Sequence, residues 1–294
     1  MAAYLKTAAS LLKLRIGIAI AASALAGMAA AQGTGPGWLR ALALAVAVIG
    51  ASGAAGAFNH YYERKTDRLM ARTRQRPFAS GMLGESLWWP AAFLGLLAVS
   101  LALAWAVSGG MAATYVFLGA FTYGIVYTVW LKRRSVWNIV VGGLAGSFAV
   151  LAGAAAVDPD PQAAPVLLAL ILFLWTPPHF WSLAASKKDD YARAGVPMLP
   201  VVASDKAWPL AILGHTIVLV ALSIAPLWFG LGTFYGVFAA VGGAIFVWRS
   251  VMLAIRPGDR RVAMANFGAS LIQLVLLVCG VLLDAASGHS TWPF

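Results

Sequence analysis

Long apolar runs separated by short polar segments make up most of the chain. Nine runs of roughly 20 mostly apolar residues lie near 14–31, 38–58, 87–107, 111–131, 136–157, 164–185, 207–229, 231–252 and 265–285. That is the length a helix needs to cross the hydrocarbon core of a bilayer. The alternating pattern of transmembrane β-strands is absent. The sequence therefore predicts an all-α, polytopic membrane protein with nine transmembrane helices, built as a single domain over residues 1–294.

Composition supports this interpretation. Of the 294 residues, 61% are hydrophobic and only 11% are charged, whereas soluble domains carry about 25% charged residues. A water-soluble globular protein and a disordered chain are both excluded. The formal net charge of +11 is typical of nucleic-acid binding only on a soluble basic face, so we expect no nucleic acid partner. The single cysteine excludes a disulfide framework.

The basic residues predict the orientation. Twenty of the 21 lysines and arginines lie before the first run or around the connections after runs two, four, six and eight, and Arg40 alone falls on the other side. Because cytoplasmic loops are enriched in basic residues, we expect a bacterial inner-membrane protein with a cytoplasmic N-terminus and a periplasmic C-terminus. Residues 14–31 also imitate a signal peptide, but the glycine-rich segment 33–37 favours a hairpin into the second helix.

A first polar segment, residues 59–77, reads NHYYERKTDRLMARTRQRP. Asn59, Glu63 and Asp67 are spaced four apart and would form one stripe on a helix that Pro77 ends. Four arginines, also spaced four apart, would form a neighbouring stripe: Arg64, Arg68, Arg72 and Arg76. Mg²⁺ binds a few carboxylates together with substrate phosphates, and arginine donates paired hydrogen bonds to phosphate. The segment predicts a site for a magnesium-chelated diphosphate, although each arginine taken singly fits a purely orienting role.

A second polar segment, residues 176–200, reads TPPHFWSLAASKKDDYARAGVPMLP. Its two prolines, Pro177 and Pro178, are expected to break or kink the helix and to turn His179 and Trp181 toward the interior or a cavity. Asp189 and Asp190 form a second carboxylate pair beside Lys187, Lys188 and Arg193. Two alternatives stay open, since a buried histidine is often structural and paired aspartates often cap a helix.

These motifs resemble a known family. N-x-x-x-E-x-x-x-D followed by R-T-x-x-R-P resembles the first signature of the UbiA superfamily of membrane prenyltransferases. P-P-H-F-W…K-D-D-Y-x-x-A-G-V-P-M-L-P, together with YTVWLKRRSVWNIVVGG at 127–143, resembles its protoheme IX farnesyltransferase branch. The likeness extends over essentially the whole chain. It implies a UbiA-like bundle of nine helices with an active site on the cytoplasmic side.

The resemblance also implies a reaction. A farnesyl group would pass from farnesyl diphosphate to a vinyl group of haem B with addition of water, giving haem O for terminal oxidases. Mg²⁺ is the implied cofactor, haem B is a substrate, and the lipid bilayer, haem A synthase and terminal oxidase assembly are implied partners. The alternatives are a UbiA-type enzyme that acts on a quinone precursor and, from another class, a membrane transporter, which would hold its charges nearer the bilayer midplane.

The same resemblance assigns roles to residues. The implied catalytic residues are Asn59, Glu63, Asp67, Asp189 and Asp190, of which Asn59, Glu63, Asp67 and Asp190 are the metal ligands. The implied diphosphate-binding residues are Arg64, Arg72, Arg76, Lys132, Arg133, Lys187 and Lys188, and the implied haem contacts are His179, Trp181 and Tyr191.

Three positions depart from the family pattern. Glu63 stands where the first signature usually has aspartate. Lys187 and Tyr191 stand where the wider superfamily has two aspartates, which leaves open whether a second Mg²⁺ binds. Residues 148–150 read Phe-Ala-Val where the branch often has a Pro-Pro pair.

Overall fold

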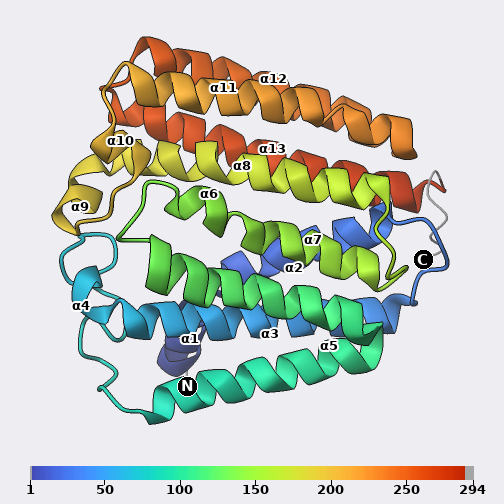
Figure 1. Ribbon diagram of the computed structural model, residues 1–294, viewed down its shortest axis with the longest axis horizontal. Coiled ribbons are helices and arrows are strands. Elements are labelled where there is room, and N and C mark those ends of the chain that lie inside the picture. The colour runs from blue at the N-terminus through green and yellow to red at the C-terminus, as the bar shows by residue number, and fades with distance from the viewer. Residues whose placement is uncertain (1, 289–294) are drawn as a thin grey trace.

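Helices run side by side through the whole bundle (Figure 1). The computed structural model describes residues 2–288, and within them every regular element is helical. The elements are α1 (Ala2–Leu11), α2 (Leu14–Ala30), α3 (Trp38–Tyr62), α4 (Arg64–Asp67), α5 (Trp88–Phe121), the π-helix η1 (Thr122–Leu131), α6 (Asn138–Gly142), α7 (Leu144–Ala155), α8 (Ala163–Ser186), α9 (Lys188–Arg193), α10 (Leu199–Val202), α11 (Ala207–Leu222), the 3-10 helix η2 (Ala225–Phe229), α12 (Thr233–Ile255) and α13 (Arg260–Ala286). The predicted all-α class is confirmed.

Seven helices of the described part are long and apolar enough to cross a membrane. One of them, Trp88–Leu131, is 44 residues long and contains the predicted third and fourth runs. Gly109, at φ +81° and ψ 175°, breaks the helical backbone between those two runs. The first predicted run forms α2, which has only 17 residues. All nine runs are therefore helical, while nine membrane crossings stay a prediction.

The two prolines of α8 do not interrupt it. The helix continues from Ala163 to Ser186 through Pro177 and Pro178. Hydroxyl groups bond carbonyl oxygens around the prolines: Thr176 Oγ1 donates to Leu172 O at 2.9 Å, and Ser182 Oγ donates to Pro178 O at 2.6 Å. Membrane helices tolerate proline where neighbouring helices surround the freed backbone, and α7, α11 and α13 pack against α8. The predicted break at this position is wrong.

Small residues bring α2 and α7 into backbone contact. A Cβ atom on Gly153 would lie 1.7 Å from the carbonyl oxygen of Ala24, and one on Gly27 would lie 2.0 Å from that of Val150. Close packing of this kind drives helix association in lipid, where water exclusion contributes little. Met28 of α2 is completely buried. Thus α2 is an integral part of the core.

The polar segments gather at one end of the bundle, where α4, α9 and α10 lie (Figure 1). Ion pairs join segments that are distant in sequence: Glu63 with Lys132, and Asp189 with Arg260. This end of the bundle carries the candidate functional site.

We predict that Gly153→Ala destabilises the protein, because its new methyl group would overlap the backbone of α2. Overpacking typically costs about 1–3 kcal/mol, so the melting temperature of the purified protein in detergent should fall by several degrees. Gly95→Ala is the matched control, since a Cβ atom at Gly95 meets nothing within 4 Å. Equal melting temperatures for the two variants would contradict the close approach of α2 and α7.

Candidate functional site

Asn59, Glu63 and Asp67 lie at the end of α3, but the helix that carries them is shorter than predicted. The chain turns at Glu63 (φ −87°, ψ 2°), directly after α3, and α4 ends at Asp67. Residues 68–83 form turns and bends. The prediction of a helix that reaches Pro77 is therefore wrong. The predicted stripe of arginines on one helix face is wrong for the same reason.

Two local features end the helix after Asp67. Thr73 Oγ1 donates a hydrogen bond to the carbonyl oxygen of Asp67 at 3.1 Å, which takes the place of a helical N–H group. Met70 and Phe78 are 3% and 2% exposed, and they pack into two different apolar clusters. The chain folds back between these two anchors instead of continuing as a straight helix.

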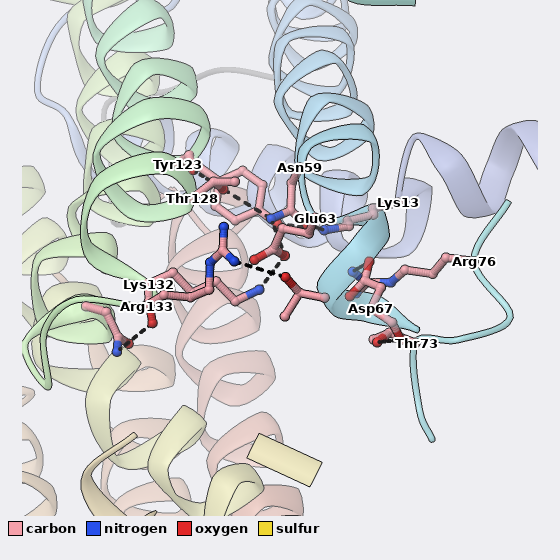
Figure 2. A network of polar contacts seen from close by, with 12 residues as sticks. Lys13, Asn59, Glu63, Asp67, Thr73, Arg76, Tyr123, Thr128, Lys132 and Arg133 are labelled. Atoms are coloured by element: carbon pink, nitrogen blue, oxygen red, sulfur yellow. Dashed lines mark hydrogen bonds and ion pairs between the residues drawn. The ribbon is translucent and has the colours of Figure 1, made fainter. Parts of the chain in front are cut away.

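Glu63 is the centre of a buried polar network (Figure 2). Its side chain is 2% exposed. Glu63 Oε2 accepts hydrogen bonds from Lys132 Nζ and, at 2.8 Å, from Asn59 Nδ2. Asn59 Nδ2 also donates to Thr128 Oγ1 at 3.1 Å. The network therefore ties the end of α3 to the end of η1.

The arginines of the first segment have different partners. Arg76 Nη1 lies 2.9 Å from Asp67 Oδ2, and this carboxylate is buried. Arg64 instead pairs with Glu85 at 2.8 Å. Arg72 forms no side-chain hydrogen bond or ion pair with any residue that the structure describes. The structure thus brings Arg76 into the Asp67 pair and commits Arg64 to a different carboxylate.

The segment after η1 contributes a second basic side chain near the cluster. Arg133 Nη1 donates to Thr66 Oγ1 at 3.2 Å, beside the pair that Lys132 makes with Glu63. Both predicted donors of this segment therefore contact α4 or the turn before it. Their role in diphosphate binding stays a prediction.

Lys13, between α1 and α2, is a member of the network that the sequence did not single out. Its Nζ donates to Asn59 Oδ1 at 2.8 Å and to Tyr123 OH at 2.6 Å. Its backbone is left-handed (φ +50°, ψ 43°), a conformation that costs roughly 1–2 kcal/mol outside glycine. A Cβ atom on Gly56 would lie 3.3 Å from Lys13 Cδ, so this glycine makes room for the lysine stem. Backbone strain of this kind clusters at functional sites.

The π-helix η1 brings Tyr123, Thr128 and Lys132 together. Lys132 N–H donates to Tyr127 O at 2.9 Å, and Thr128 Oγ1 donates to Tyr123 O at 2.8 Å, both five residues back along the chain. In an α-helix of 3.6 residues per turn, positions 123 and 132 would lie on opposite faces. The wider π turn aligns them instead, and such segments are frequent at functional sites.

The charges of the cluster perturb one another. Burial raises the pKa of Glu63, but the charge and hydrogen bond of Lys132, with Lys13 and Arg76, outweigh burial and hold that pKa below 4.5. Burial lowers the pKa of Lys13 well below its ordinary value, and the charges of Arg76 and Lys132 lower it further. An anion bound beside these three basic groups would relieve their mutual repulsion.

The oxygen atoms of Asn59, Glu63 and Asp67 fit a magnesium ion whose other ligands are water and substrate oxygens. Glu63 Oε2 and Asp67 Oδ2 hold basic partners, whereas Glu63 Oε1 and Asp67 Oδ1 make no hydrogen bond or ion pair within the described chain. Two such carboxylate oxygens, with an amide oxygen from Asn59, are the limited set that Mg²⁺ takes beside water and phosphate oxygens. Residues 2–288 contain no group of three or more His, Cys, Asp or Glu side chains that could hold a metal ion.

Asp189 and Asp190 lie at the same end of the bundle but have their own partners. Asp189 pairs with Arg260 and Asp190 with Arg193. Within the described residues, no hydrogen bond or ion pair connects Asp190 with the partners of Glu63 and Asp67, which are Lys132 and Arg76. The role of Asp190 as a metal ligand, and of Asp189 in catalysis, stays a prediction.

The lysines of the second segment also stand apart from the Glu63 network. Lys188 pairs with Asp205 at 3.1 Å. The side chain of Lys187 makes no hydrogen bond or ion pair with the described residues and lines a cavity beside α9. Their predicted role in diphosphate binding is not supported by any contact with the first segment.

The three predicted haem contacts are all buried. The ring of His179 stacks between Trp175, at 4.1 Å, and Phe267, at 4.4 Å between ring centroids, and its Nδ1 lies 2.7 Å from Ser270 Oγ. These contacts join α8 to α13 and are typical of a structural histidine. Trp181 and Tyr191 belong to the apolar cluster that also contains Met70 of the first segment.

Comparison with known proteins identifies the family. The model of the UbiA prenyltransferase family matches residues 20–272. A protein of Paramagnetospirillum magneticum named protoheme IX farnesyltransferase 2 is 55% identical over 284 residues, which cover 97% of this chain and 98% of that protein. The chain belongs to the UbiA prenyltransferase family. A second protein of that organism, protoheme IX farnesyltransferase 1, is 48% identical over 93% of this chain and 96% of its own length.

Solved structures confirm the UbiA fold. A structure of digeranylgeranylglyceryl phosphate synthase superimposes with a TM-score of 0.77 at 17% identity, covering 96% of this chain and 99% of that one. A UbiA homolog from Archaeoglobus fulgidus bound to GPP and Mg²⁺ gives 0.66 at 14% identity, with 94% and 99% covered. The family match begins at residue 20, so Lys13 lies outside the segment that matches the family model.

We predict that Lys132→Met reverses the pH dependence of stability. In the native chain the depressed pKa of Glu63 contributes stability that is present above pH 4.5 and is lost as the pH falls through that depressed pKa. Without the ammonium group, burial dominates and raises the pKa of Glu63. The melting temperature of the variant in detergent should therefore increase as the pH falls from 7 toward 4.5.

Two further variants serve as controls for this experiment. Lys65→Met removes an exposed lysine and should leave the native pH profile unchanged. Glu63→Gln combined with Lys132→Met should remove the increase in melting temperature that the single variant shows as the pH falls. A Lys132→Met profile parallel to that of the native chain would contradict the buried ion pair.

Proposed function

We propose that this chain transfers the farnesyl group of farnesyl diphosphate to a vinyl group of haem B, with addition of water, to give haem O and diphosphate. Its buried acid–base cluster lies at one end of a UbiA bundle, as a diphosphate-ionising site requires. The observation that carries the acceptor is the 55% identity, over nearly the whole of both chains, to a protein named protoheme IX farnesyltransferase 2.

Mg²⁺ fits the oxygen ligands of Asn59, Glu63 and Asp67, and a related UbiA structure is bound to Mg²⁺ together with the prenyl diphosphate GPP. When bound, the ion would supply positive charge to the phosphate oxygens and so assist cleavage of the allylic carbon–oxygen bond. Lys13 Nζ donates to Asn59 Oδ1 at 2.8 Å, so a metal ion bound to that oxygen would lie close to the lysine. The amide thus links metal binding to the position of the lysine.

The basic side chains exchange partners when the diphosphate enters. Lys132 and Arg76 hold carboxylates in the free site, and Lys13 holds an amide oxygen. With the diphosphate present, all three donate to its oxygens and stabilise the negative charge that develops as the bond breaks. Preorganised charge of this kind is usually the largest catalytic contribution.

The chemistry that follows joins two carbon centres. The allylic carbon–oxygen bond breaks and its electron pair leaves with the diphosphate. The π electrons of the haem vinyl group form the new bond to the farnesyl cation, which leaves a cation on the carbon next to the porphyrin. Water adds to that carbon and loses a proton, which completes the hydroxyethylfarnesyl group. The apolar helices provide the surroundings that keep other water from the farnesyl cation.

The same proposal places the protein in its membrane. On the topology predicted from the sequence, 20 of the 21 basic residues share one side of the membrane, so a site among them would face the cytoplasm of a bacterial inner membrane, with the N-terminus on that side. Haem A synthase and terminal oxidase assembly remain predicted partners.

The direct test is expression in a bacterial membrane supplied with haem B and farnesyl diphosphate, followed by chromatography of the extracted haems. We expect a later-eluting haem whose mass corresponds to haem B plus a farnesyl group and water. If haem B alone is recovered with both substrates present, the proposed function is wrong.

We predict that Asp67→Asn lowers turnover by at least about 100-fold, because the site loses a metal-binding charge and Arg76 loses its partner. Glu63→Asp should keep partial activity, since it preserves the charge. Both variants should be assayed beside Gly95→Ala, a helix substitution that meets no neighbour within 4 Å. Normal turnover of a folded Asp67→Asn protein would remove the assigned metal role.

A further inference from the structure

A polar cavity of about 500 Å³ lies beside α9, apart from the Glu63 network. Its wall comes from three segments: the first polar loop, the end of α8 together with α9, and the first turns of α13. The lining residues are Ala71, Ser186, Lys187, Asp189, Asp190, Arg193, Arg260, Arg261 and Met264. A cavity of this size is comparable with the sites of small organic ligands.

The charges of the cavity do not cancel. Four of its side chains are basic and two are acidic. The acidic pair is already neutralised, because Asp189 binds Arg260 and Asp190 binds Arg193. Lys187 and Arg261 make no side-chain hydrogen bond or ion pair within residues 2–288. The cavity therefore presents two unpaired cations to an anionic ligand.

Aromatic side chains join the segments that carry the cavity and the Glu63 network. Tyr191, next to Asp190 in the chain, packs in the same apolar cluster as Met70 and Tyr127. Lys132 Nζ, which binds Glu63, lies 5.6 Å from the centroid of the Tyr127 ring. The segment that lines the cavity and the segment that carries Lys132 thus contribute aromatic side chains to the same apolar cluster.

We propose that Lys187 and Arg261 bind the two propionate carboxylates of the haem acceptor. This inference rests on the proposed function, because it names how that acceptor is held. In haem B the propionates share one edge of the porphyrin and the vinyl groups lie toward the other. An acceptor held by its propionates beside α9 would direct a vinyl edge toward the Glu63 network.

Physical chemistry supports this orientation. A carboxylate is costly to bury without a partner, so the propionate edge belongs at the polar end of the bundle while the macrocycle lies against apolar side chains. Arginine suits a carboxylate because its guanidinium donates two parallel hydrogen bonds. Met264, one turn from Arg261 on α13, offers an apolar contact within the same cavity. Lys187, expected from the family resemblance to bind diphosphate, is thereby reassigned to the acceptor.

The test uses the full chain in lipid nanodiscs and two acceptors, haem B and its dimethyl ester, which lacks both carboxylates. The native protein should show a KM for the ester about tenfold or more above that for haem B, as expected for the loss of charge-assisted hydrogen bonds. The variant Lys187→Gln with Arg261→Gln should raise the KM for haem B about tenfold. It should leave the KM for farnesyl diphosphate unchanged and bind the two acceptors alike.

Controls separate binding from general charge and from misfolding. Arg256→Gln removes an exposed arginine of the same connection that does not line the cavity, and it should behave as the native chain. Arg261→Lys retains the charge and should keep most of the preference for haem B. Haem binding followed by absorbance, without turnover, should show the same differences, which keeps this test distinct from the proposed reaction.

Two outcomes would overturn the proposal. If the double variant raises the KM for farnesyl diphosphate and leaves that for haem B unchanged, the cavity serves the diphosphate. If the double variant matches Arg256→Gln with both acceptors, the two cations have no role in acceptor binding. A native protein that makes no haem O at all would instead contradict the proposed function.

Discussion

The architecture of this site depends on the pairing of buried charges. Glu63 and Asp67 are each 2% exposed, and a buried carboxylate without a partner would cost several kcal/mol. The partners come from elsewhere in the chain: Lys132 from the end of η1, and Arg76 from the loop after α4. Because both carboxylates must be satisfied, these pairings fix how the segments meet at one end of the bundle (Figure 2).

The pairings that stabilise the free site also suit it to a charged substrate. A buried ion pair adds little net stability when compared with apolar packing, so its members can be given up to better partners. A diphosphate with Mg²⁺ offers such partners to both kinds of group at once. Lys13 extends this logic, because it donates to the amide oxygen of Asn59 that we assign to the metal. The cavity beside α9 lies outside this exchange, and its unpaired Lys187 and Arg261 remain available to a second anionic ligand.

The sequence predicted much of this fold because the hydrophobic runs determine where helices form in a membrane. It also predicted that Asn59 and Glu63 lie together, since a spacing of four needs only local helical geometry, and their side chains are hydrogen-bonded. The sequence did not predict the features that depend on tertiary contacts. The helix stops at Asp67 because Thr73 binds its carbonyl oxygen, and α8 continues through its prolines. The alignment of Tyr123 with Lys132 depends on a π-helix that α-helical periodicity does not reveal, and Lys13 resembles any basic residue before an apolar run.

The central claim is that a magnesium–diphosphate complex exchanges partners with the ion pairs at this end of the bundle. A cryo-electron microscopy structure of the protein in nanodiscs with Mg²⁺ and S-farnesyl thiodiphosphate, an unreactive analogue, tests it most directly. The account predicts metal density bound by Glu63 and Asp67, with Lys132 and Arg76 within hydrogen-bond distance of the diphosphate oxygens. Diphosphate density elsewhere, with both ion pairs intact, would contradict it.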